Sequence, residues 1–83
     1  MTLREFYDCV IDLEWSLESL DHEGAEAVRT ARLGGATSSE ILERVWFALL
    51  KTRDNYVDLA PRVEPLLDFI DSVLGPSPGR KTP

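Results

Sequence analysis

A regular spacing of apolar residues over the first twenty positions constrains the fold of this chain more than any other feature. These residues follow one another at intervals of three or four positions: Leu3, Phe6, Val10, Leu13, Leu17 and Leu20. This spacing places the side chains on one face of an α-helix and does not fit a strand. Thr2 and Glu5 form a capping box at its start. The sequence therefore predicts a helix over residues 3–20.

Two further helices are predicted from caps and periodicity. Asp21 is a candidate N-cap for a short helix over residues 22–33. Gly34 and Gly35 are expected to end it, because glycine adopts the left-handed conformation without steric cost. Thr37 and Glu40 form a second capping box, directly before an apolar face typical of a helix. This pattern predicts a helix over residues 38–55.

The last helix is bounded by proline and glycine. Proline is tolerated in the first turn of a helix and disfavoured deeper within it. The helix is therefore expected to begin between Pro61 and Pro65, after a single loose turn, and to end at Gly75. Its predicted core face has six members: Val63, Leu66, Leu67, Ile70, Val73 and Leu74.

These segments predict an all-α fold, a small antiparallel bundle of three long helices and one short helix. The 83 residues suffice for one domain, expected to span residues 1–75. Residues 76–83 are polar and rich in proline and glycine, which predicts a disordered, flexible C-terminal tail. Cys9 is the single cysteine, and no segment resembles a signal peptide or a membrane span. These features predict a cytoplasmic protein.

The net charge of −6 is concentrated in the first part of the chain. Residues 1–26 carry a charge of −7, and residues 27–83 carry +1. An acidic surface disfavours nucleic acid and anionic membranes as direct partners and favours basic proteins.

Residues that support catalysis or cofactor binding are sparse. Cys9 and His22, the only soft ligand candidates, are thirteen residues apart and have no companions at metal-ligand spacing. They cannot meet as nucleophile and base, because about 20 Å of helix separates them. Cys9 is expected to be a small, partly buried hydrophobe, and His22 a solvated residue in the first turn of the second helix. The sequence therefore predicts no catalytic residues, no metal site and no cofactor.

A second stripe beside the core face of the first helix is the candidate partner-binding surface. The stripe consists of Tyr7, Ile11 and Trp15, with Glu14 and Glu18 interleaved, whereas Asp8 and Asp12 lie on the face away from the core. The candidate partner-binding residues combine the stripe with nearby acids: Tyr7, Asp8, Ile11, Asp12, Trp15 and Glu18. Asp8 and Asp12, like Glu14 and Glu18, are like-charged pairs four residues apart, which destabilise a helix by about 0.2–0.5 kcal/mol each. The acids therefore pair either with bases on other helices or with a basic partner. The apolar members either pack internally or contact another molecule.

The leading hypothesis is a non-enzymatic protein-binding module. Its sharpest version is an inhibitor or immunity-type protein that neutralises a basic nucleic-acid-binding protein by charge mimicry. The alternative is a homo-oligomeric assembly subunit that uses the second stripe as a self-interface. A third hypothesis, an enzyme that uses scattered carboxylates, requires a deep pocket lined by carboxyl groups with raised pKa values.

Overall fold

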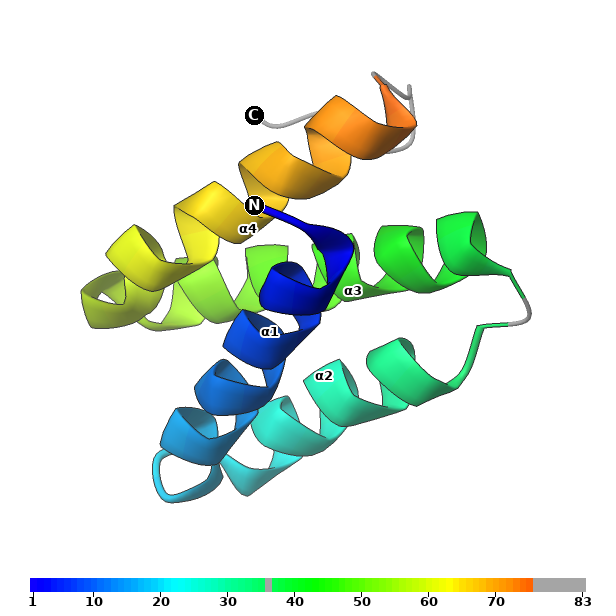
Figure 1. Cartoon of the computed structure of the whole chain (residues 1–83). Coiled ribbons are helices and arrows are strands. Elements are labelled where there is room, and N and C mark those ends of the chain that lie inside the picture. The colour runs from blue at the N-terminus through cyan, green and yellow to red at the C-terminus, as the bar shows by residue number, and fades with distance from the viewer. Residues whose placement is uncertain (36, 76–83) are drawn as a thin grey trace.

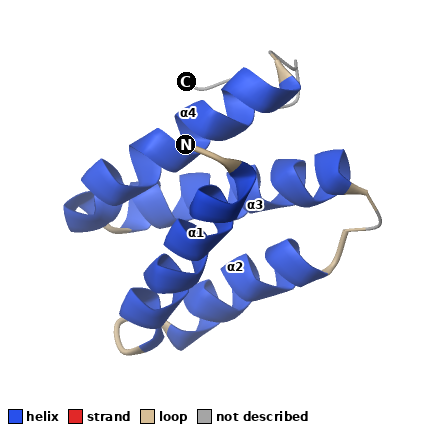
Figure 2. Cartoon of the chain, viewed as in Figure 1, coloured by secondary structure: helices blue, strands red, loops and turns tan. Residues whose placement is uncertain are grey.

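The computed structural model describes residues 1–35 and 37–75, and the regular structure of these residues is helical throughout. Four α-helices follow one another: α1 (Leu3–Glu18), α2 (His22–Leu33), α3 (Ser38–Asn55) and α4 (Ala60–Leu74). A 3₁₀ turn, η1 (Val57–Leu59), precedes α4. These elements confirm the predicted all-α bundle (Figure 2). The predicted tail, residues 76–83, lies outside the described residues.

Helices that are consecutive in the chain pack side by side (Figure 1). α1 and α2 form one hairpin, α2 and α3 the next, and α3 and α4 the last, so that α1 also meets α4 across the bundle. The rings of Phe6 on α1 and Phe69 on α4 stack there with centroids 5.0 Å apart. The fully buried Trp46 is the largest side chain of the core.

The N-terminal caps are those that the sequence predicts. Thr2 accepts a hydrogen bond from the Glu5 amide, and the Glu5 carboxylate accepts one from the Thr2 amide, which completes the first capping box. The Asp21 carboxylate caps α2 through the Gly24 amide, and the Thr37 hydroxyl caps α3 through the Glu40 amide. Each cap satisfies a donor that a helix start would otherwise leave unpaired.

The ends of the predicted core faces are corrected by the structure. α1 stops at Glu18 rather than at residue 20, and the chain then turns into α2. Leu3, Leu20 and Val73, which were expected in the core, are exposed: Leu3 and Val73 lie at the ends of α1 and α4, and Leu20 lies in the turn after α1. The central positions of both faces are buried as predicted.

Gly34 and Gly35 end α2 for a different reason from the one expected. Neither residue adopts a left-handed conformation, and Gly34, the C-cap, has φ −98°. At Gly35 a Cβ atom would lie 2.3 Å from the Ile41 side chain, so this position excludes a side chain because α3 passes close to it. Gly75, with φ 75°, is the glycine that uses the left-handed region, at the end of α4.

The start of α4 also differs from the prediction. The loose turn is present as η1, but the helix begins at Ala60 and contains Pro65 six residues in. Pro61 lies in the first turn, where a missing amide proton costs nothing. Pro65 cannot donate to the carbonyl of Pro61, so α4 lacks one hydrogen bond at this point.

Candidate functional site

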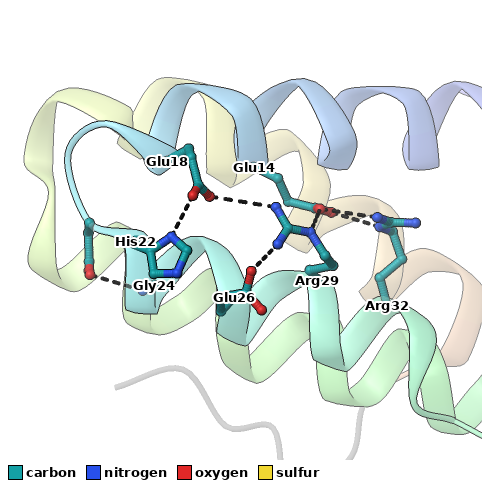
Figure 3. Close-up of polar contacts among 8 residues, drawn as sticks. Glu14, Glu18, His22, Gly24, Glu26, Arg29 and Arg32 are labelled. Carbon is teal, nitrogen blue, oxygen red and sulfur yellow. Dashed lines mark hydrogen bonds and ion pairs between the residues drawn. The ribbon is translucent and has the colours of Figure 1, made fainter.

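Apart from Glu5, which caps the start of the helix, the acids of α1 divide into two groups, and the first faces α2. Glu14 is only 3% exposed, although it is charged. Its two oxygens accept hydrogen bonds from Arg32, from Nε at 2.7 Å and from a terminal nitrogen at 3.1 Å (Figure 3). Arg29 Nε lies 3.5 Å from the same carboxylate. This charge-assisted pairing raises the pKa of the Arg32 guanidinium, and it links α1 to α2.

Glu18 extends the same network to the start of α2. Its carboxylate lies 2.5 Å from His22 Nδ1 and 3.6 Å from Arg29, which also pairs with Glu26 (Figure 3). The hydrogen bond and the negative charge of Glu18 raise the pKa of His22 above its ordinary value of 6.5. Bases on α2 therefore neutralise Glu14 and Glu18, which agrees with the alternative in which the acids of the first helix pair with bases on other helices.

Three residues of this network, Glu18, His22 and Glu26, are of types that also bind metal ions. One ligand atom from each of Glu18, His22 and Glu26 lies within 4.8 Å of the other two. Around a tetrahedral zinc ion, ligand atoms at bond lengths near 2.1 Å lie about 3.4 Å apart. Arg29 contacts both of these carboxylates and supplies the positive charge there. We therefore interpret the cluster as an ion-pair network that closes the hairpin.

The second group of acids lies on what we call the outer face of α1, formed by Arg4, Asp8, Asp12 and Trp15. At about 100° per residue these positions share an arc of about 80° on the side away from the core. Trp15 is 74% exposed, and Arg4, Asp8 and Asp12 are also exposed. Among the described residues, no hydrogen bond or ion pair engages the carboxylates of Asp8 and Asp12. This face combines a large aromatic side chain with two free negative charges.

The remaining two members of the predicted stripe lie between these groups. Tyr7 and Ile11 are half-buried, and the Tyr7 ring packs edge-on against Phe6 at 5.3 Å. Burial raises the pKa of the Tyr7 hydroxyl. Internal packing therefore accounts for much of the surface of Tyr7, whereas Trp15 is left to solvent. The structure thus brings Asp8, Asp12 and Trp15 together and draws Glu18 into the ion-pair network.

A groove between α1 and α4 lies beside the outer face. We call it the α1–α4 groove; its volume is about 270 Å³, and Asp12 lies on its rim. Its walls are mainly apolar: Met1, Leu13, Pro61, Pro65 and Leu66. Cys9 also lines it and is exposed, which corrects the expectation of a partly buried hydrophobe. On the side of α4, the groove that Cys9 lines is formed by residues of the N-terminal part of that helix, among them Pro61 and Pro65.

The hollows and the shifted carboxyl groups of the described part of the chain bear on the hypothesis of a carboxylate enzyme. Besides the α1–α4 groove, two shallow hollows of about 270 and 290 Å³ lie beside α3. All three are smaller than the roughly 300–1,000 Å³ typical of small-molecule sites. Hydrogen bonds from backbone amides lower the pKa values of Glu5 and Asp21, whereas a general acid would need a raised value.

Comparison with protein-family models, with curated proteins and with solved structures finds no match to this chain. Within the described ranges, each helix is too short or too polar to cross a membrane.

The sequence leaves open whether Glu14 pairs with a base on another helix or with a partner protein, and it does not predict that Glu14 is buried. Its position four residues after Val10 and three before Leu17 already puts it beside the core face. Arg29 and Arg32 on the next helix complete the signal, because a buried carboxylate needs a base nearby.

Proposed function

We propose that this protein is a non-enzymatic binding module that engages a basic protein through the outer face of α1. The observation that carries the proposal is Trp15, which is 74% exposed beside the unpaired carboxylates of Asp8 and Asp12. A single exposed aromatic residue is ordinary on a protein surface. Tryptophan is among the residue types that most often dominate binding energy at interfaces, and here it lies beside two carboxylates that have no partner in the described part of the chain.

The sign of the charge favours a basic partner over a second copy of the chain. In a symmetric dimer the outer face would meet the same patch of the second copy, so the net charge of the patch would meet itself. Each copy brings two acids, Asp8 and Asp12, and one base, Arg4. Like charges would therefore face one another on balance, which costs binding energy. A basic surface opposite the same face removes this repulsion.

The distribution of charge supports the sharper version, an inhibitor or immunity-type protein. The excess of acids is confined to residues 1–26, and bases of α2 neutralise only the part of it that faces inward. The carboxylates of Asp8 and Asp12 are free to occupy positions where a basic protein would hold phosphates. Such a surface would compete with nucleic acid for the partner and would associate fastest at low salt.

Affinity capture from the native host tests the proposal with matched variants. Trp15→Glu removes the aromatic side chain of the outer face, and Val57→Glu makes the same charge change at an exposed site on η1. We expect wild type and Val57→Glu to capture the same basic protein and Trp15→Glu to lose it, while all three melt alike. Equal capture by all three variants, or capture of acidic proteins only, contradicts the proposal.

A further inference from the structure

The α1–α4 groove is contiguous with the outer face of α1 through one residue. Asp12 belongs to the outer face and also lies on the rim of the groove. The same groove is also lined by the apolar residues Leu13, Pro61 and Leu66. A molecule held by Asp8 and Asp12 therefore lies beside an apolar hollow.

The size and lining of the groove suit one side chain of a protein. Its volume of about 270 Å³ is below the range of about 300–1,000 Å³ that encloses small-molecule ligands. The polar side chains at its edge are Asp12 and Arg62, and Arg62 donates a hydrogen bond to the Ser16 hydroxyl at 2.8 Å. An apolar side chain can enter such a hollow without leaving a buried polar group unpaired.

The helix that forms one wall breaks a local folding rule at this place. Pro61 and Pro65 are four residues apart, so both rings lie on the same side of α4, and both are exposed in the groove. Pro65 removes a backbone hydrogen bond from the helix interior. Proteins break such rules chiefly at functional or strained sites. The rigid proline rings give the groove an apolar wall with little conformational entropy to lose on binding.

We propose that the α1–α4 groove receives an apolar side chain of the basic partner, carried next to a lysine or arginine that pairs with Asp12. This inference rests on the proposed function and specifies which features of the partner are recognised. The occupant is a basic amphipathic segment of another protein. Its charges meet Asp8 and Asp12, and its apolar anchor covers Cys9 and the two prolines.

Cys9 provides the probe, because it is the only thiol in the chain and lines the groove. Two synthetic peptides of equal length and charge are compared, one of lysine and leucine and the other of lysine and serine. The rate of Cys9 alkylation by N-ethylmaleimide, an uncharged reagent, is measured against peptide concentration. The lysine–leucine peptide should slow alkylation about tenfold at roughly ten times its Kd, and the lysine–serine peptide should leave the rate unchanged.

Two variants separate the groove from the acids. Pro65→Gln replaces an apolar wall with a residue that favours a helix, so the fold is retained and protection of Cys9 should fall. The Asp8→Asn/Asp12→Asn variant should bind either peptide less tightly.

If the lysine–leucine peptide binds through the acids and Cys9 still reacts at the free rate, the groove inference is wrong and the proposed function stands. Equal protection by both peptides, or no protection at millimolar peptide, also contradicts the groove inference. Binding of both peptides that is indifferent to the acid substitutions contradicts the proposed function itself.

Discussion

At the scale of single residues, the surroundings of each acid decide what it does. Glu14 and Asp12 are two positions apart on one helix, yet Glu14 is buried between two arginines and Asp12 is exposed at the rim of a groove. Burial forces a charged group to find a counter-charge inside the molecule. The exposed acids have no such requirement and stay available to a partner.

Glu14→Ala should lower the free energy of unfolding by about 1–3 kcal/mol. The substitution leaves Arg32, which is largely buried, without the carboxylate that it contacts at 2.7 Å. Urea unfolding measures the loss. Asp12→Ala on the same helix is the control and should change stability by no more than about 0.5 kcal/mol. Equal effects of the two substitutions would contradict the conclusion that Glu14 stabilises the fold through an internal ion pair and that Asp12 does not.

The pair of His22 and Glu18 should make stability depend on pH. The folded protein raises the pKa of His22 above 6.5, chiefly through Glu18 and more weakly through Glu26, while desolvation and the charge of Arg29 oppose the shift. A raised pKa stabilises the fold fully below the unfolded value, and this contribution is lost as the pH rises through the folded value. Unfolding free energies measured from about pH 6 to 8 should therefore fall more steeply for wild type than for His22→Gln. Identical slopes would show that the pair contributes nothing.

At the scale of elements, α4 carries the clearest departure from local preference. Pro65 lies in the helix interior, where proline is about 3 kcal/mol less favourable than alanine. The helix forms because its other face packs Val63, Leu67 and Ile70 into the core.

Pro65→Ala should raise the free energy of unfolding by about 1–3 kcal/mol, because it restores an amide donor to the Pro61 carbonyl. Pro61→Ala is the control and should be close to neutral, since a first-turn amide has no partner inside the helix. Thermal melting of the two variants beside wild type provides the comparison. A loss of stability in Pro65→Ala would mean that the proline ring contributes packing that outweighs the missing hydrogen bond.

The sequence predicts the elements well and their ends less well. Caps and apolar spacing act within a few residues, so Thr2, Asp21 and Thr37 locate three helix starts correctly. The exposure of Leu3, Leu20 and Val73, at or just past the ends of α1 and α4, depends on tertiary packing, which no local pattern contains. Tertiary packing also carries α4 through Pro65, against the local preference.

Local patterns predict the candidate surface only in part, again because they contain no information on tertiary packing. The helical wheel grouped Asp8, Asp12 and Trp15 on one side of α1, and the structure places them together and exposed. Whether Glu18 pairs with a partner or with α2 depends on the packing angle of the hairpin. The groove beside Asp12 lies between two helices that are distant in sequence, so the sequence of either helix alone does not predict it.

At the scale of the whole molecule, the two tryptophans occupy opposite environments. Trp46 is fully buried, whereas Trp15 is 74% exposed. Acrylamide should therefore quench one component of the fluorescence and leave the other nearly untouched. We expect the quenched fraction to stay constant as the protein is concentrated, because like charges on the outer face oppose self-association. A quenched fraction that falls with concentration would favour the homo-oligomeric subunit.

The central claim is that the free carboxylates on the outer face of α1 attract a basic protein. Its most direct test is the association rate constant with the captured partner, measured by stopped flow over a range of salt concentrations. We compare wild type with Asp8→Asn/Asp12→Asn and with Asp58→Asn/Asp68→Asn, which removes two exposed acids elsewhere. We expect the association rate to fall steeply with salt for wild type and for the control pair, and to be slower and less salt-dependent for the outer-face pair. Equal rates and equal salt dependence for all three proteins would contradict it.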